Sequence, residues 1–165
     1  MKTRHSAALL LVAALALSGC SLINSSPKRD SEGQVEKDTK ASVTDLKLGD
    51  CTGPMADGEI SEQTLVPCAN EHYWEVYHTQ TLPEGPFPAD MNDIAEGTCY
   101  EALEPFLGAA YEESEYEFFL LTPLRESWTA GDRTISCLVG LEQGGVTGTL
   151  KGVDASSEEG ETTES

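Results

Sequence analysis

The sequence predicts an α+β domain, in which a small antiparallel sheet packs against one main helix and two disulfides staple the core. Three features favour this fold class. They are a strongly alternating strand late in the chain, one amphipathic helix in its middle, and an even number of cysteines behind an export signal.

The clearest strand covers residues 134–141. Ile135, Cys137, Val139 and Leu141 recur at every second position, which is the period of a strand with one buried face. Four further runs predict strands, at residues 43–48, 63–67, 73–79 and 117–122. Strands on both sides of a single helix fit an antiparallel sheet covered by that helix.

One helix is predicted from about residue 90. Residues 90–93 (Asp-Met-Asn-Asp) offer capping side chains, and apolar residues follow at spacings of three and four, namely Met91, Ile94, Ala95, Cys99, Ala102, Leu103 and Phe106. Gly97 weakens the helix, and Pro105 lacks the amide that an interior position needs. The helix is therefore expected to end near Glu104.

An export signal opens the chain. Lys2 and Arg4 precede an apolar run from Ala7 to Leu17, which is well short of the roughly 20 residues that a spanning helix needs. The run ends in Leu-Ser-Gly-Cys at residues 17–20, which resembles the lipobox of bacterial lipoproteins. We expect removal of residues 1–19 as a signal peptide and attachment of diacylglycerol and palmitate to Cys20, on the extracytoplasmic face of the cell membrane. An ordinary secretory signal with an incidental cysteine is the alternative.

Composition divides the remaining chain into three parts. Residues 20–41 contain almost nothing apolar to bury and are expected to form a lipidated, disordered tether. Residues 42–152, about 110 residues, suffice for one small domain. Residues 153–165 hold five carboxylates among Ser, Thr and Gly and predict an acidic disordered tail, to which we assign no site.

The chain is strongly acidic. Its formal charge is −19, and removal of Lys2 and Arg4 with the signal leaves 8 basic residues against 29 acidic ones, a charge of −21. Nucleic-acid binding and docking on anionic lipid both require clusters of lysine and arginine. We therefore expect no nucleic-acid partner, and membrane attachment through the lipid on Cys20 alone.

Four cysteines remain once Cys20 is lipidated. In an exported small domain they predict two disulfides, for which three pairings are possible. We prefer Cys51–Cys68, which would tie two strand ends, and Cys99–Cys137, which would join the inner faces of the helix and the last strand. A zinc site at Cys68 with His72 and His78 is the alternative, but it lacks the paired ligands of a zinc knuckle. No metal and no cofactor are therefore expected.

Several short motifs of this domain resemble the actinobacterial septum formation family, whose members are exported or membrane-attached. The motifs that match, in order, are Leu46–Cys51, Val66–Cys68, His72 with Glu75 and Val76, Cys99, Trp128–Arg133, Cys137 and Gly148–Gly152. One departure is Glu71 before His72, where the family often has proline. The resemblance implies an extracytoplasmic domain associated with cell division.

His72 and Glu75 form the most plausible catalytic pair by residue type. A strand that includes residue 72 places His72 on one face with Trp74, Val76 and His78, and Glu75 on the other, so the two side chains diverge. Nucleophile elbows, phosphate loops and calcium loops have no match in the sequence. We therefore assign no catalytic residue and expect a protein that is not an enzyme.

Five residues are predicted to contribute to a binding surface. Tyr73, Glu75 and Tyr77 would share the outward face of their strand. Trp128 and Arg133 flank a turn before the last strand, where they either grip an anionic or sugar-bearing ligand or serve the fold, with Arg133 paired to a carboxylate.

The leading functional hypothesis is a non-enzymatic, lipid-anchored domain that binds an envelope or division protein or a wall polymer, in septum formation. A general extracytoplasmic ligand-binding or sensing lipoprotein is the first alternative. An envelope hydrolase, which would need two carboxylates converging in a pocket, is the second.

Overall fold

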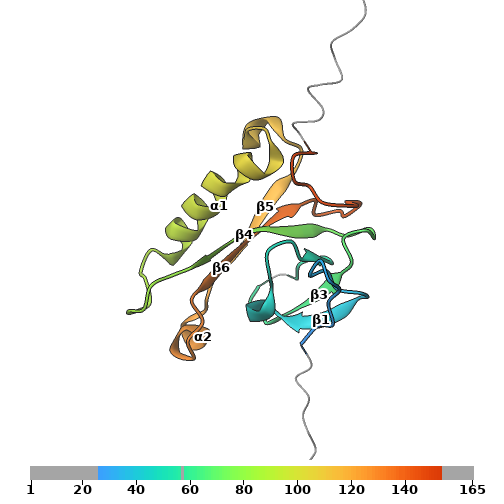
Figure 1. The fold of residues 1–165 in the computed structure, drawn as a ribbon. Helices are drawn as coiled ribbons and strands as arrows, with labels where there is room; N and C mark the ends of the chain where they lie inside the picture. The colour runs from blue at the N-terminus through green and yellow to red at the C-terminus, as the bar shows by residue number, and fades with distance from the viewer. Residues whose placement is uncertain (1–25, 57, 154–165) are drawn as a thin grey trace, which may run out of the picture.

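The computed structural model describes residues 26–56 and 58–153, and its centre is a six-stranded antiparallel sheet (Figure 1). The strand order is β1-β3-β2-β4-β6-β5. The strands are β1 (Thr39–Ser42), β2 (Cys51–Thr52), β3 (Glu62–Val66), β4 (Trp74–Thr81), β5 (Glu117–Leu121) and β6 (Thr134–Gly140). The helical elements are α1 (Met91–Leu107), α2 (Arg125–Thr129) and the short 3-10 turns η1 (Val43–Asp45) and η2 (Tyr111–Glu113). The predicted α+β class, with one main packed helix, is confirmed.

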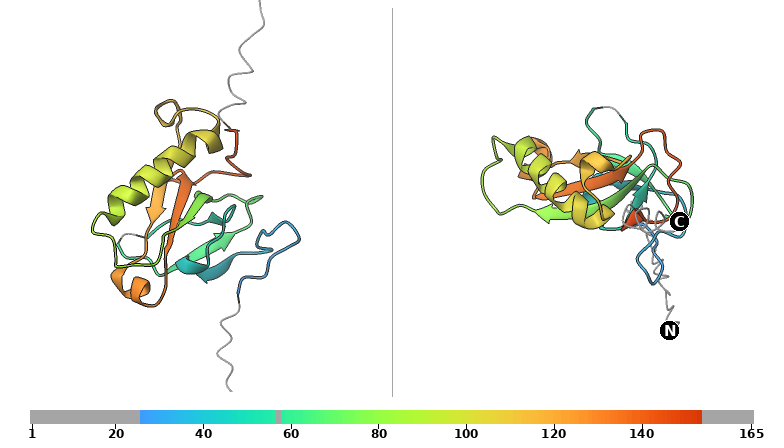
Figure 2. Two further views of the ribbon diagram at one scale, coloured as in Figure 1. Left: turned by 60° about the vertical axis from the view of Figure 1, so that its left-hand side comes forward. Right: turned by 90° about the horizontal axis from the view of Figure 1, so that it is seen from above.

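The two central strands, β4 and β6, are buried on both faces. Toward α1, one cluster joins Ile135, Cys137 and Val139 of β6 to the stripe of Met91, Ala95, Cys99, Leu103 and Leu107 on the helix. On the opposite face, Leu138 packs with Trp74 and Val76 of β4 and with residues of the N-terminal part of the chain. Figure 2 shows α1 on one side of the central strands and the N-terminal strands of the same sheet, which curls, on the other side. The single buried face expected for the last strand is therefore wrong.

A β-bulge interrupts β4 at Tyr77. Val76 pairs with Leu138 and His78 with the next β6 residue, Cys137, so Tyr77 is an additional residue without a partner of its own. A bulge shifts the alternation of side chains beyond it. His78 consequently lies opposite Cys137 of the α1-side core, and the face expected for it with Trp74 and Val76 is wrong.

Helix α1 continues beyond the expected end at Glu104. Pro105 lies in the last turn, and the helix ends at Leu107. Gly108 caps it with a φ of 93° and donates a backbone hydrogen bond to the Glu104 carbonyl. Pro105 removes one amide donor near the exposed end of the helix. The buried Leu103 and Leu107 on either side hold that turn on the sheet.

The part of the expected tether that the structure describes, residues 26–41, is folded onto the domain. Val35 and Ala41 are buried, and β1 pairs with β3. Arg29 forms a two-pronged ion pair with the buried Asp50, whose second oxygen, Oδ2, lies 2.8 Å from Nη2 of Arg29. The strand expected at 43–48 is wrong as well, because the strand comes before residue 43 and η1 follows it. The signal peptide, Cys20 and residues 154–165 of the expected tail lie outside the described residues.

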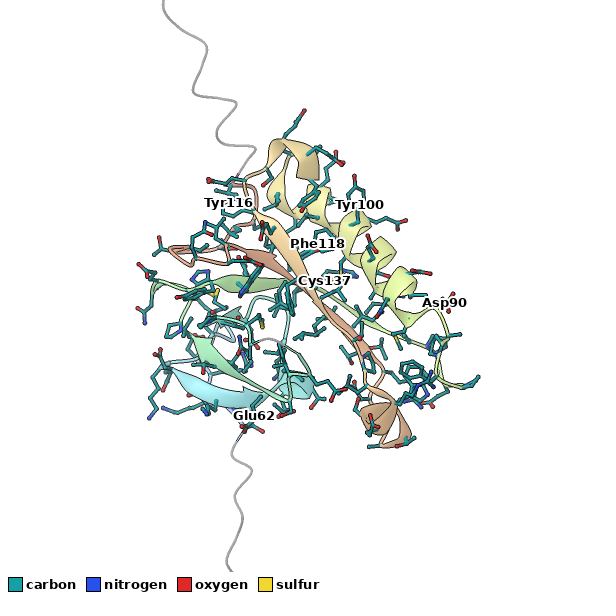
Figure 3. All side chains as sticks on the ribbon, turned by 180° about the vertical axis from the view of Figure 1, so that it is seen from behind. Glu62, Asp90, Tyr100, Tyr116, Phe118 and Cys137 are labelled. Carbon is teal, nitrogen blue, oxygen red and sulfur yellow. A yellow bond between two sulfur atoms is a disulfide. The ribbon has the colours of Figure 1, made fainter. Side chains whose placement is uncertain are left out.

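Both preferred disulfides are present. Cys51 and Cys68 have Cα atoms 5.2 Å apart, and Cys99 and Cys137 have Cα atoms 5.4 Å apart. The second disulfide joins the buried stripe of α1 to the middle of β6, where Cys137 is labelled in Figure 3.

Candidate functional site

His72 and Glu75 both hold the C-terminal segment in place. The backbone of His72 exchanges two hydrogen bonds with Val146, and its Nδ1 lies 3.0 Å from the carbonyl of Asn70. The Glu75 carboxylate accepts 2.7 Å hydrogen bonds from the Thr149 hydroxyl and the Leu150 amide. Both side chains are buried. Their observed contacts thus serve the fold, and the Nε2 atom of His72 has no hydrogen-bond partner among the described residues.

The predicted outward face of Tyr73, Glu75 and Tyr77 does not exist as a surface. Tyr77 is 4% exposed, and its hydroxyl donates a 2.6 Å hydrogen bond to the Cys99 carbonyl beneath α1. Burial also raises the pKa of this tyrosine. Tyr73 is half-buried, and its ring packs so closely on Gly144 that a β-carbon added to this glycine would lie only 2.8 Å from the ring. Helix α1 and the C-terminal segment cover this face, so Glu75 and Tyr77 are not surface residues.

The alternative zinc site at Cys68, His72 and His78 lacks a free thiolate. Cys68 is in a disulfide. Within residues 26–56 and 58–153, no group of three or more His, Cys, Asp or Glu side chains is placed to hold a metal ion.

Trp128 and Arg133 do meet, at the turn between α2 and β6. The turn is fixed by Asp132, whose carboxylate accepts hydrogen bonds from the Ser127 hydroxyl and the Thr134 amide, and by Gly131 with a φ of 103°. The guanidinium of Arg133 lies 3.8 Å from the centre of the Trp128 ring. This is a cation–π arrangement, and it holds the arginine head in one orientation.

The hydrogen bonds of Arg133 leave one edge of its guanidinium weakly held. Its Nη1 donates to the carbonyls of Trp128 and Asp132 at 2.7 and 2.8 Å, whereas Nη2 donates at 3.1 Å to Glu84. The side chain of Glu84 is 87% exposed and that of Arg133 only 12%. The buried Nε of Arg133 has no hydrogen-bond partner among the described residues. The predicted carboxylate partner is therefore present, but it is a solvent-exposed one that is easily displaced.

Arg133 and Glu84 both line a groove of about 510 Å³, which we call the Arg133 groove. Its wall is rich in hydroxyl groups, since it includes Thr44, Thr81, Ser127 and Thr134 besides Glu84 and Asp132. Hydroxyls and a positioned guanidinium are suited to carboxylate and sugar ligands.

A second groove, of about 570 Å³, lies on the other side of α2 and includes Arg125, Phe87 and Asp90. The guanidinium of Arg125 lies 4.5 Å from the centre of the Phe87 ring, and that ring meets Trp128 edge to face at 5.6 Å. Asp90 marks the start of α1 in Figure 3.

The loop that supplies Phe87 and Glu84 was not connected with Trp128 in the sequence analysis. The only available signal was an aromatic residue between two prolines, Pro86 and Pro88.

No helix among the described residues is long and apolar enough to span a membrane.

Comparison with known proteins identifies relatives without an assigned activity. Proteins named as uncharacterized membrane proteins in two strains of Mycobacterium tuberculosis are each 30% identical to this chain over 118 residues, covering 64% of the chain and 26% of the relative. The chain thus spans about a quarter of the length of the curated relatives that it matches. No solved structure matches it. The family model described as "Septum formation" matches residues 19–137 and residues 48–163. With most of its length matched by that model, the chain belongs to the septum formation family.

Proposed function

We propose that this chain is a lipid-anchored, extracytoplasmic and non-enzymatic domain that acts in septum formation by binding a carboxylate-bearing envelope ligand in the Arg133 groove. The observation behind this proposal is the state of Arg133, whose guanidinium lies on the Trp128 ring and is bonded through Nη1 to two backbone carbonyls, while its Nη2 is paired with one exposed glutamate.

The location is supported by the disulfides and by the export signal. Two disulfides are typical of a protein that folds outside the reducing cytoplasm. Lipid on Cys20 would leave only six residues before Pro27, a span of at most about 25 Å when extended. The folded domain would then lie close to the membrane surface, with residue 26 nearest to it.

The choice of an anionic ligand rests on local charge. Arg125 and Arg133 are the only basic residues between residues 48 and 150, and they line the two grooves that flank α2. The other charged side chains of that stretch are carboxylates, which repel an anion. A single carboxylate group fits this arrangement better than a run of adjacent anionic groups, because the net charge of −21 that remains without Lys2 and Arg4 repels long anionic chains.

The proposed absence of catalysis rests on how the reactive side chains are used. The imidazole of His72 is buried against the Asn70 carbonyl, the buried carboxylate of Glu75 holds the C-terminal segment, and the four cysteines outside the signal region form disulfides. A binding role requires none of them to be free.

The binding step is tested by two substitutions of opposite expected sign. Isolated cell-wall sacculi, whose peptides carry carboxylates, are sedimented with the soluble Cys20→Ser chain. Arg133→Gln should weaken co-sedimentation about tenfold, because it removes a charge-assisted contact worth roughly 1.5–3 kcal/mol. Glu84→Gln should strengthen it, because it removes the competing carboxylate from an exposed position. Equal retention of all three proteins would refute the Arg133 groove as the ligand site.

The cellular role is tested by the position of a C-terminal fluorescent fusion in dividing cells, alongside its Cys20→Ala form. Septal enrichment that depends on Arg133 supports the proposal. Uniform membrane signal would remove the septal role and favour a general ligand-binding or sensing lipoprotein.

A further inference from the structure

A third pocket lies at the end of the molecule opposite α2, where the last turns of α1 meet η2. Its volume is about 330 Å³, and it is lined by Tyr100, Glu101, Glu104, Ala110, Tyr111 and Glu112. Figure 3 labels Tyr100 on α1, next to Phe118 on β5. The pocket is at the small end of the roughly 300–1,000 Å³ range of ligand sites. It therefore has room for one side chain and not for a large cofactor.

The two aromatic walls are held in a fixed geometry. The rings of Tyr100 and Tyr111 stand edge to face with centroids 6.2 Å apart, and Tyr111 in turn packs on Phe118 at 5.4 Å. The Tyr100 hydroxyl donates a 2.8 Å hydrogen bond to Glu112. Even so, Tyr100 is 47% exposed, which is unusual for a large aromatic residue. An ordered and exposed aromatic wall is typical of a binding surface.

The remaining wall is made of carboxylates without internal counterions. Glu101, Glu104 and Glu112 line the pocket, and none of the ion pairs between described residues involves them. The sequence has no lysine or arginine from residue 48 to residue 124. The pKa of Glu112 is lowered by a backbone hydrogen bond and by the Tyr100 hydroxyl, so this carboxylate keeps its charge. Only a cation from outside this stretch of chain complements the pocket.

We propose that this pocket, the Tyr100 pocket, is a docking site for a lysine or arginine side chain of a protein partner. An ammonium or guanidinium group gains both from the exposed aromatic ring of Tyr100 and from the carboxylates that line the same pocket, a combination that no neutral or anionic group can use. The C-terminal end of α1, which lines this pocket, and the first described residues of the chain lie at opposite ends of the domain (Figure 1). A lipid-anchored domain would thus present it away from the membrane.

This proposal takes from the proposed function only the premise that the domain binds other envelope components. Ser127 of α2 lines the Arg133 groove, and Figure 1 shows α2 at the other end of the domain from the last turns of α1, so the two sites can be tested separately.

The test is a nuclear magnetic resonance titration of the soluble Cys20→Ser chain with a short capped peptide of glycine and serine around one lysine. We expect shifts of the amides around Tyr100 and Tyr111, and no shifts with the same peptide carrying uncharged norleucine. Tyr100→Leu and Glu104→Gln should each weaken binding about two- to fivefold. Tyr100→Phe should bind within about twofold of the unsubstituted chain, since it keeps the ring.

The matched control is Glu96→Gln, which removes the same charge from an exposed position of α1 outside the pocket. Equal weakening by Glu96→Gln and Glu104→Gln would mean diffuse attraction to an acidic surface and would overturn the proposal. So would a loss with Tyr100→Phe as large as with Tyr100→Leu, or binding of tetramethylammonium as tight as that of the peptide. Arg133→Gln should leave this titration unchanged, so a failure of the proposed function does not affect the outcome.

Discussion

Arg133 and Trp128 form one end of a chain of contacts between two arginines and two aromatic rings. The Arg133 guanidinium lies 3.8 Å from the Trp128 ring centre, Trp128 meets Phe87 edge to face at 5.6 Å, and Arg125 lies 4.5 Å from the Phe87 ring centre. The indole Nε1 of Trp128 also donates a 3.0 Å hydrogen bond to the carbonyl of Gly85. The loop of residues 83–89 and helix α2 are therefore joined through Trp128, with a positive charge in the groove on either side.

Replacing Trp128 should loosen both grooves together. Trp128→Leu removes the surface under Arg133, the contact with Phe87 and the bond to Gly85, and should cost about 3 kcal/mol of unfolding free energy. Trp128→Phe keeps a ring and loses the bond to Gly85, for about 1 kcal/mol. Urea denaturation of the two variants measures the difference. Similar losses for both would mean that the ring contributes little.

The two disulfides should differ in what their loss costs. On the chain-entropy model, closing a loop of 38 residues contributes about 4 kcal/mol and one of 17 residues about 3 kcal/mol. Cys99 and Cys137 are also fully buried, whereas Cys68 is only half-buried. Alanine pairs at each disulfide, compared by urea denaturation, should therefore show the larger loss for Cys99 and Cys137. The opposite ranking would show that entropy and burial do not set the order.

Sequence alone was sufficient for the elements that have a local pattern. The strand at 134–140 and the helix follow from alternation and helical spacing, and the even number of cysteines predicts two disulfides, of whose three possible pairings the preferred one is present. The pairing of Trp128 with Arg133 was foreseen because both flank one turn. Glu84 and Phe87 were not, because they reach that turn from more than 40 residues away along the chain.

Other features depend on contacts that no local pattern encodes. Residues 26–41 are ordered by the ion pair of Arg29 with Asp50 and by pairing of β1 with β3, although their composition is typical of a disordered tether. The extra residue at Tyr77 changes the alternation of β4. Because β1–β3 and α1 cover opposite faces of the central strands, residues expected to face solvent are buried instead.

The ion pair that orders the N-terminal arm should show strong coupling. Arg29→Met leaves the buried Asp50 carboxylate with one remaining hydrogen-bond donor among the described residues, the Lys47 amide. The free energy of unfolding should fall by about 2 kcal/mol, less than for a fully buried pair because Arg29 is partly solvated. The double variant Arg29→Met/Asp50→Asn should cost less than the sum of the two single variants, by about 1–2 kcal/mol. A double-mutant cycle from urea denaturation gives this coupling. Strict additivity would mean that the two side chains act independently.

Glu75 should control the C-terminal segment locally. Glu75→Gln keeps one acceptor oxygen for either the Thr149 hydroxyl or the Leu150 amide and turns its amide NH₂ toward the other donor. The free energy of unfolding should therefore fall by about 1–3 kcal/mol. Hydrogen exchange of the Leu150 amide, which donates to Glu75, should accelerate most. Glu71→Gln, at an exposed position nearby in sequence, is the matched control and should leave that amide protected. Unchanged protection in Glu75→Gln would refute this role.

Tyr77 should make the domain sensitive to alkali. Burial raises the pKa of Tyr77 in the folded protein, and its hydroxyl donates a hydrogen bond to the Cys99 carbonyl. The unfolded chain releases this proton near pH 10 and the folded chain does not, so the unfolded state binds fewer protons above that pH. Stability is then fully present below about pH 10 and falls above it by up to roughly 1.4 kcal/mol per pH unit. Tyr77→Phe should lower stability at neutral pH by about 1 kcal/mol through the lost hydrogen bond, and should flatten the alkaline slope. Urea denaturation from pH 8 to pH 11 measures both effects, and an unaltered slope in Tyr77→Phe would assign the alkaline loss to other groups.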